Sequence, residues 1–242
     1  MKAEELRIVI LTGAGVSAES GVATFRGAGG LWEGHRIEEV ASPKGFLRNP
    51  TLVQQFYNLR RSALTTVEPN AAHLALAKLE LALGGNRVTL ITQNVDDLHE
   101  RAGSQHLLHM HGELLKARCL SCDKVHPWAQ DIDPESTCPS CAAVGRLRPH
   151  IVWFGEMPLY LDDIEHALVR ATHFVSIGTS GRVYPAAGFV NLARQSGAHC
   201  IEFNVERSDV SSAFHEHRIG AATAEVTRWV EQILVKPAGS AA

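Results

Sequence analysis

The chain has 242 residues, of which 45% are hydrophobic and 20% charged, and its formal net charge at neutral pH is -3. These values are ordinary for a globular protein with one substantial core, and they exclude the basic surface of a dedicated nucleic-acid-binding protein. The N-terminus lacks the apolar core of a secretory signal, and no segment approaches the ~20 apolar residues of a membrane helix. We therefore expect a cytoplasmic protein with neither a membrane nor a specific nucleic acid as a partner.

Short apolar runs predict four buried strands, at residues 7–11, 88–92, 174–177 and 200–203. Apolar residues at helical spacing predict helices at residues 51–64, 71–83, 162–172, 185–195 and 225–235. This alternation is typical of an α/β fold with a mostly parallel sheet. Because ligands bind beyond the carboxyl ends of such strands, we expect the polar turns that follow all four strands to meet in one cleft.

A glycine-rich turn follows the first predicted strand, at residues 12–18 (TGAGVSA). Glycines at this position let main-chain amides approach a pyrophosphate, although a tight strand-to-helix turn would have the same pattern. No second strand ending in an acid follows about 20 residues later, as the ordinary dinucleotide-binding pattern requires. Phe25, Arg26, a glycine-rich stretch at residues 27–34 and Trp32 follow instead. The pattern therefore suggests a nucleotide held in a different way, under a mobile loop.

Polar residues follow the second predicted strand, in the sequence Gln93-Asn94-Val95-Asp96. Amides and a carboxylate at a strand end can hold a ribose or an amide. A histidine titrates near neutral pH and can act as a general base, and the segment at residues 109–114 (HMHGEL) offers two. By residue type alone, His109 and His111 are equal candidates.

Four of the five cysteines form two close pairs fifteen residues apart, within a stretch of 118–148 that has little periodicity. Two Cys-x-x-Cys pairs at this spacing predict a tetrahedral zinc site with no open position, and therefore a structural metal. The four predicted ligands are Cys119, Cys122, Cys138 and Cys141.

Two side chains in the predicted helix at residues 51–64 are three positions apart, so they lie on one helix face. They are Tyr57 and Arg60. A phenol and a guanidinium together can bind a carboxylate, although an amphipathic surface pair would have the same spacing.

Together these segments resemble one family, the sirtuins, which are NAD-dependent protein lysine deacylases. The matching blocks follow the family order over nearly the whole chain, and they resemble most closely the bacterial members and the class III branch that removes acidic acyl groups. The blocks are GAGVSAESGVATFRGAGGLW (13–32), TQNVDDLHERAG (92–103), HMHGEL (109–114), the four cysteines, RPHIVWFGE (148–156), GTSGRVYPAA (178–187) and FNVE (203–206).

The resemblance implies a single catalytic unit over residues 1–242 with a Rossmann-like large domain and a smaller domain. The large domain would comprise residues 1–27, 84–117 and 149–242. The small domain would be built from a helical insert at 28–83, which carries the acyl pocket, and a zinc module at 118–148. NAD and the acyl-lysine peptide would enter the cleft between the domains from opposite sides.

The resemblance also assigns roles to individual residues. His111 would be the general base, and Asn94 and Asp96 would position the ribose and nicotinamide. Residues expected to bind the acylated peptide are Ala41, Tyr57, Arg60, Val152 and Phe154. Residues expected to bind NAD are Gly13, Ala14, Gly15, Ser17, Ala18, Phe25, Arg26, Trp32, Gln93, Asn94, Val95, Asp96, Gly178, Thr179, Ser180, Asn204, Val205, Glu206 and Ala222.

The implied reaction removes succinyl, malonyl and also acetyl groups from protein lysines, and it releases nicotinamide and O-acyl-ADP-ribose. Alternatives are a plain deacetylase, a non-catalytic NAD-sensing module, a zinc-ribbon nucleic-acid binder and an ADP-ribosyltransferase. Gln93, Asn94, Asp96 and His111 are all present, which argues against a non-catalytic module. The charge balance disfavours a nucleic-acid binder.

Overall fold

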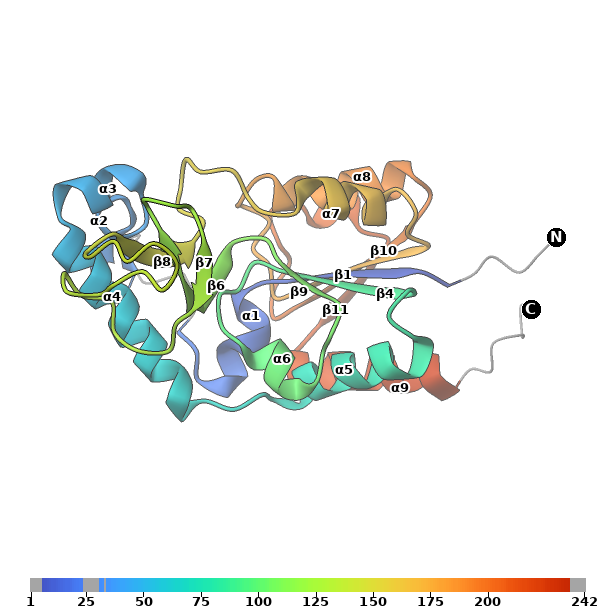
Figure 1. Cartoon of the computed structure of the whole chain (residues 1–242). Coiled ribbons are helices and arrows are strands. Elements are labelled where there is room, and N and C mark those ends of the chain that lie inside the picture. Colours follow the sequence, from blue (N-terminus) through green and yellow to red (C-terminus); the bar gives the residue numbers. More distant parts are fainter. Residues whose placement is uncertain (1–5, 24–30, 33, 236–242) are drawn as a thin grey trace.

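The computed structural model describes residues 6–23, 31–32 and 34–235. A six-stranded parallel sheet crosses the molecule, in the strand order β11-β10-β9-β1-β4-β5 (Figure 1). Its strands are β1 Ile8–Thr12, β4 Val88–Thr92, β5 Leu107–His109, β9 His173–Ile177, β10 His199–Asn204 and β11 Glu216–Ile219.

Helices cover both faces of this sheet (Figure 1). On β1, Ile8 and Ile10 face a core shared with α5 (Ala71–Leu83) and α9 (Ala222–Val235), whereas Val9 and Leu11 face a second core shared with α7 (Leu161–Leu168) and α8 (Phe189–Gln195). All five residues of β1 are buried, as expected for a central parallel strand whose successive side chains point to opposite faces. The chain therefore forms a three-layer α/β structure.

A smaller unit lies beyond one end of the large sheet (Figure 1). It contains a three-stranded antiparallel sheet in the order β7-β6-β8, next to a group of helices. The strands are β6 Gly112–Cys119, β7 Val125–Pro127 and β8 Leu147–Ile151, and the helices are α2 Ile37–Val40, α3 Pro43–Arg48 and α4 Pro50–Ala63. The side chain of Arg61 on α4 donates to the Leu114 carbonyl of β6 at 2.8 Å, so helix and sheet are joined directly.

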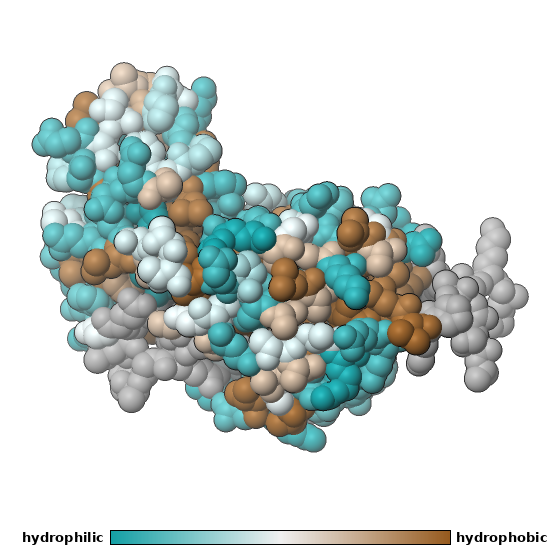
Figure 2. Space-filling view, turned by 90° about the horizontal axis from the view of Figure 1, so that it is seen from below, coloured by the Kyte–Doolittle hydropathy of each residue, from teal (hydrophilic) through white to brown (hydrophobic). Residues whose placement is uncertain are grey.

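Short elements complete the described chain. They are α1 Ala14–Ser17, β2 Leu31–Trp32, β3 His35–Arg36 and α6 Leu98–Ala102, with 3-10 turns at Ala18–Ser20, Leu64–Thr66, Ala186–Gly188 and Ser211–Ala213. Within the described residues, every helix is too short or too polar to cross a bilayer. The surface seen from below carries hydrophobic groups scattered among hydrophilic ones (Figure 2).

The four predicted strands and the predicted α/β class are confirmed, and the helix at residues 71–83 has the predicted bounds. α7 ends at Leu168 rather than at 172, and α8 begins at Phe189 after a single 3-10 turn, rather than at 185. α9 begins three residues earlier than expected, because the carboxylate of Glu19 accepts hydrogen bonds from the main-chain N–H and the hydroxyl of Thr223 and so stabilises the first turn. The tail at residues 237–242, expected to be disordered, lies outside the described residues.

The expected boundaries between the large and small domains differ from the structure at two places. α5, expected in the insert at 28–83, packs on the large sheet, because Leu76 and Leu79 share a core with Ile8. β6 begins at Gly112 and pairs with β8, so the antiparallel sheet extends beyond 118–148 on both sides. The expected zinc module is therefore the outer part of a longer sheet.

Candidate active site

One cavity of about 850 Å³ lies at the carboxyl ends of β1, β4, β9 and β10 and reaches the helix α4 of the smaller unit. This volume is in the range of small-molecule sites. The four polar turns that follow the predicted strands meet here, as expected. The strand-end residues that line the cavity are Gly13, Ala14, Gly15, Gln93, Asn94, Val95, Asp96, Gly178, Thr179, Ser180, Asn204, Val205 and Glu206.

The glycine turn after β1 lies directly against the turn after β9. The main-chain N–H of Gly15 donates to the Gly178 carbonyl at 3.0 Å. A Cβ atom at Gly15 would lie 2.6 Å from the Gly178 Cα, closer than atoms of two residues can approach. Gly178 itself has φ +62, which favours glycine. The wall is therefore main chain at this point, as a bound phosphate group requires.

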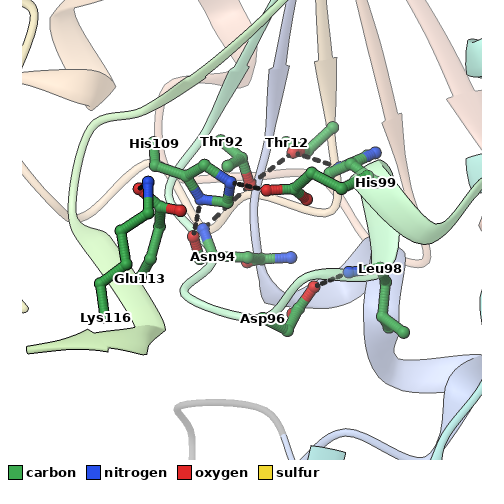
Figure 3. Close-up of polar contacts among 10 residues, drawn as sticks. Thr12, Thr92, Asn94, Asp96, Leu98, His99, His109, Glu113 and Lys116 are labelled. Atoms are coloured by element: carbon green, nitrogen blue, oxygen red, sulfur yellow. Dashed lines mark hydrogen bonds and ion pairs between the residues drawn. The ribbon is translucent and has the colours of Figure 1, made fainter. Parts of the chain in front are cut away.

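Asn94 is held on several sides, so its orientation is fixed. Its main-chain N–H donates to Thr92 Oγ1 at 3.0 Å, and its Nδ2 donates to Ser17 Oγ at 3.1 Å. The Ser17 hydroxyl in turn donates to Asp96 Oδ2 at 3.1 Å. Figure 3 shows Asn94 and Asp96 on the loop that follows Thr92.

Asp96 is buried at the same loop, and burial raises the pKa of its carboxyl, although hydrogen bonds from the Leu98 N–H and from Ser17 oppose this rise. A carboxylate in this setting accepts hydrogen bonds strongly, because little water competes for it. The loop thus presents a fixed amide and a desolvated acid to the cavity.

The two candidate histidines lie in different surroundings. His111 lines the cavity, and its Nδ1 bonds to the Gln93 carbonyl at 3.1 Å. Because a carbonyl only accepts, Nδ1 carries the hydrogen in the neutral ring and Nε2 is the basic nitrogen. Burial lowers the pKa of His111, which keeps it unprotonated near neutral pH. His109 is buried outside the cavity lining and bonds to Glu100 and to the Asn94 carbonyl.

Some residues expected at the NAD site are not part of the cavity wall. Ser17 is buried behind it and acts on Asn94 and Asp96 through hydrogen bonds. Ala18 lies in the turn after α1, and Ala222 is the first residue of α9; neither lines the cavity. Phe25 and Arg26 lie outside the described residues, as does most of the stretch 27–34. Trp32 is described only by its main chain, which pairs with His35.

All five residues expected to contact the acylated peptide line the other end of the same cavity, namely Ala41, Tyr57, Arg60, Val152 and Phe154. Ala41 is buried, and its carbonyl accepts the Phe154 N–H at 3.0 Å. The small side chain at position 41 leaves room beside α4. The main-chain N–H of Val152 donates to the His111 carbonyl at 2.9 Å, which ties this wall to the candidate base.

Tyr57 is completely buried, and the Trp153 Nε1–H donates to its hydroxyl oxygen at 3.0 Å. Burial raises the pKa of Tyr57 far above its usual value, so the phenol keeps its hydrogen at neutral pH. The guanidinium of Arg60 lies 5.7 Å from the centre of the Phe56 ring. Beside it, Arg61 points away into the core and bonds to Leu114. The two adjacent arginines therefore have different surroundings: Arg60 lines the cavity, and Arg61 is buried between α4 and β6.

Trp153, Arg148 and Glu156 were not among the site residues predicted from the sequence, although they lie in the matching block at 148–156. The Arg148 guanidinium lies 3.5 Å from the centre of the Trp153 ring and forms a bidentate ion pair with Glu156 at 2.7 and 2.9 Å. Glu156 also accepts the Trp153 N–H at 2.9 Å. An indole fixed in this way holds the Tyr57 hydroxyl in place. The available signal was the chemistry of the segment RPHIVWFGE, in which two opposite charges flank an aromatic residue.

The four predicted cysteine ligands converge at the tip of the antiparallel sheet, with all four sulfur atoms within 4.8 Å of one another. The Cys119 and Cys141 sulfurs are 3.7 Å apart, and those of Cys122 and Cys138 are 3.8 Å apart. Four sulfurs at Zn–S bonds of about 2.3 Å in a tetrahedron lie about 3.8 Å apart. Two of the sulfur–sulfur distances match this spacing and the others do not exceed 4.8 Å, so the cluster suits a tetrahedral zinc ion.

Comparisons with known proteins agree with this geometry. The model of the Sir2 family matches residues 13–185. An "NAD-dependent protein deacylase" of Vibrio parahaemolyticus is 58% identical over 229 residues, which is 94% of this chain and 95% of that protein. The crystal structure of a Sir2 homologue in complex with NAD is 40% identical with a TM-score of 0.84, covering 94% of this chain and 90% of that one. A Sir2 protein bound to an acetylated peptide is 27% identical with a TM-score of 0.80, covering 95% and 94%.

Proposed function

The chain belongs to the Sir2 family of NAD-dependent protein deacylases, and from that premise we propose that it removes succinyl and malonyl groups from lysine side chains, with some activity on acetyl groups. NAD and an acylated-lysine protein are its two substrates. The residues that line its cavity support a particular class of acyl group.

The observation that carries this proposal is the pairing of Arg60 and Tyr57 in the cavity that also contains His111. We call the part lined by Ala41, Tyr57, Arg60 and Trp153 the acyl end. An acetyl group offers only a methyl group there, with which a guanidinium forms no hydrogen bond. A succinyl or malonyl group ends in a carboxylate, which a guanidinium and a phenol hydrogen both bind.

The strand-end part of the cavity, which we call the nucleotide end, binds NAD. Its residues include the main-chain turn at Gly13–Gly15, together with residues 93–96, 178–180 and 204–206. Glycine at positions 13 and 15 lets the turns after β1 and β9 pack against each other through their main chains, so that main-chain amides form this wall and can bind a pyrophosphate. We further assign Ser17, Ala18, Phe25, Arg26, Trp32 and Ala222 to this binding site on the basis of the family resemblance.

When bound, NAD supplies the ribose carbon to which the acyl group is transferred, and nicotinamide is lost. Asn94 and Asp96 hold the ribose and nicotinamide in a fixed orientation, which lowers the entropic part of the barrier. His111 removes a proton from a ribose hydroxyl through Nε2, while its Nδ1–H stays on the Gln93 carbonyl.

The substrate peptide lies between the segments 151–154 and 181–184, both of which contribute to the cavity wall. Main-chain pairing between an extended peptide and such segments makes few demands on the peptide sequence. We expect loose sequence specificity around the modified lysine, and a peptide array should reveal it. A strict consensus on the array would contradict this mode of binding.

The zinc site is structural, and the chain is one catalytic unit with a large and a small domain. We assign α5 to the large domain because it packs on the large sheet, and β6 and β8 to the small one because they pair with each other. We also propose a cytoplasmic location, because reduced thiols are what four metal-binding cysteines require.

The acyl preference can be tested on one peptide that carries a single lysine with an acetyl, malonyl or succinyl group. Mass spectrometry should record NAD-dependent loss of each group, with the largest kcat/KM on the two acidic groups. Nicotinamide release without peptide is the control for transfer to other acceptors. Loss of the acetyl group alone would leave a plain deacetylase and end the proposal.

A further inference from the structure

His109 lies at the end of β5, buried between α6 and the loop that carries Asn94 (Figure 3). Its two ring nitrogens have separate partners. Nε2 is 2.6 Å from Glu100 Oε1 on α6, and Nδ1 is 3.3 Å from the Asn94 carbonyl oxygen. The ring therefore connects a helix to the main chain of a residue in the NAD site.

Both partners of His109 are acceptors. A carboxylate and a carbonyl oxygen have no hydrogen to give, so each ring nitrogen must supply its own. A neutral imidazole has only one N–H, and it would leave one lone pair directed at an oxygen. Only the doubly protonated ring makes both hydrogen bonds at once.

The charged groups around His109 favour the same state. Glu100 faces it from α6 and Glu113 from β6, where Lys116 pairs with Glu113 at 2.7 Å. Asp96 and His99 are the other titratable groups that interact with it. Burial by itself lowers the pKa of His109, but the hydrogen bond and charge of Glu100, with the charge of Glu113, raise it above its ordinary value.

His111, two residues further on, has the opposite arrangement. Its Nδ1 bonds to the Gln93 carbonyl, and the ring borders the cavity. A single acceptor is satisfied by the neutral ring. The carbonyls of Gln93 and Asn94, which are consecutive, are thus each bound by a histidine, one neutral and one charged.

We propose that His109, protonated on both nitrogens, is a positioning residue that holds the Asn94 main chain and so fixes the Asn94 side chain at the nucleotide end. This inference rests on the proposed function only in so far as Asn94 contacts NAD. The remaining contacts of Asn94, to Thr92 and Ser17, leave its carbonyl to His109. Without that hydrogen bond, the loop loses one of its three attachments at this residue.

Two substitutions of similar size separate the two ring nitrogens. The amide nitrogen of asparagine can take the place of Nδ1, and that of glutamine the place of Nε2. His109→Asn keeps a donor for the Asn94 carbonyl, whereas His109→Gln keeps one for Glu100. We expect His109→Gln to lower kcat/KM for NAD by about tenfold and His109→Asn by less than about threefold, with similar melting temperatures. Equal losses, or a larger loss in His109→Asn, would refute the positioning role.

The protonation state can be measured without any substrate. In protein labelled with ¹⁵N-histidine, both His109 nitrogens should show charged-ring shifts above pH 6.5, and the His109→Asn spectrum identifies the signals. Glu100→Gln should lower the titration midpoint of His109. The control is Glu68→Gln. It removes an exposed carboxylate that pairs with Arg101, a residue of α6 like Glu100. A His109 midpoint at or below about 6.5, the ordinary value, would overturn the inference. Failure of the proposed function would appear separately, as absence of deacylation by the unaltered protein.

Discussion

Main-chain atoms and short side chains form the nucleotide end of the cavity, whereas long side chains from α4 and from the segment after β8 form the acyl end. At the nucleotide end, Gly15 and Gly178 touch through their backbones, and Asn94 is fixed by hydrogen bonds from three directions. At the acyl end, Arg60 reaches the cavity from a helix whose neighbouring Arg61 serves only the packing.

This difference separates the reaction from the choice of substrate. A change at the nucleotide end alters atoms that every substrate needs. A change at the acyl end alters contacts that only some acyl groups make. Four substitutions test whether each end of the cavity can be changed without affecting the other, from the largest expected effect to the smallest.

His111→Ala should reduce deacylation of succinyl-lysine and acetyl-lysine alike, by on the order of 10²–10⁴-fold, because a general base contributes about that much. NAD binding, measured by calorimetry, should persist because Asn94 and the glycine turn remain. His109→Ala should be clearly milder. Comparable losses for the two alanine variants would mean that the base is assigned wrongly.

Cys138→Ser should release the zinc and lower the free energy of unfolding by about 4–5 kcal/mol or more, since loss of a structural metal is among the largest effects of a single substitution. β8 leads from the zinc site to the wall at Val152, so the acyl end should suffer more than NAD binding. Metal analysis and chemical denaturation measure the effect. The control is Cys200→Ser, which should keep one zinc per chain, and a wild-type protein with far less zinc would contradict the assignment.

Arg60→Met should lower kcat/KM on succinyl-lysine by roughly 10- to 100-fold, because a charge-assisted pair is worth about 1.5–3 kcal/mol. Acetyl-lysine offers no carboxylate, so its kcat/KM should change far less. Arg60→Lys keeps the charge but loses the bidentate geometry, so its kcat/KM on succinyl-lysine should lie between the wild-type value and that of Arg60→Met. Should both substrates lose equally in Arg60→Met, the two ends would not be independent, and Arg60 would be a packing residue.

Acid should destabilise the folded protein through His73, which is buried on α5 with its Nε2 3.4 Å from Ser17 Oγ, behind the nucleotide end. Burial lowers the pKa of His73 to about 4, so between that value and its ordinary pKa of about 6.5 the unfolded chain binds a proton that the folded chain does not. Stability therefore falls as the pH drops through this window, by about 2 kcal/mol from this group at pH 5. His73→Gln should reduce the difference between urea unfolding at pH 7 and pH 5. An unchanged difference would show that another group is responsible.

The sequence predicted best what depends on near neighbours in the chain. Two Cys-x-x-Cys pairs predict a metal site because the ligands of each pair are local, and the four sulfurs do converge. The strands can be predicted because a buried parallel strand forms a short, nearly continuous apolar run. The helix at 71–83 had clear periodicity, but periodicity does not say which sheet a helix covers, so its assignment to the small domain was misplaced.

What the sequence could not predict depends on partners distant in the chain. His109 and His111 are equivalent as residue types; the family resemblance favours His111, and in the structure the Glu100 carboxylate and the cavity distinguish the two. Ser17, in the glycine turn, is expected to bind NAD, and its sequence position does not predict that its hydroxyl bonds to Asp96, 79 positions away. β7 and a long loop lie between β6 and β8 in the chain, and these two strands pair with an irregular register, so their pairing does not follow from the sequence pattern.

The face that α4 turns toward the cavity has a consequence for redesign. Tyr57, Arg60 and Ala63 follow one another along this face, and all three line the cavity. An α-helix rises about 1.5 Å per residue, so position 63 lies roughly 4.5 Å along the axis from Arg60. The position of the guanidinium along the helix therefore sets the length of acyl chain whose carboxylate it can reach. Moving the basic residue by one turn would tune the enzyme to diacids of a different chain length, while the strand ends that carry out the transfer stayed as they are.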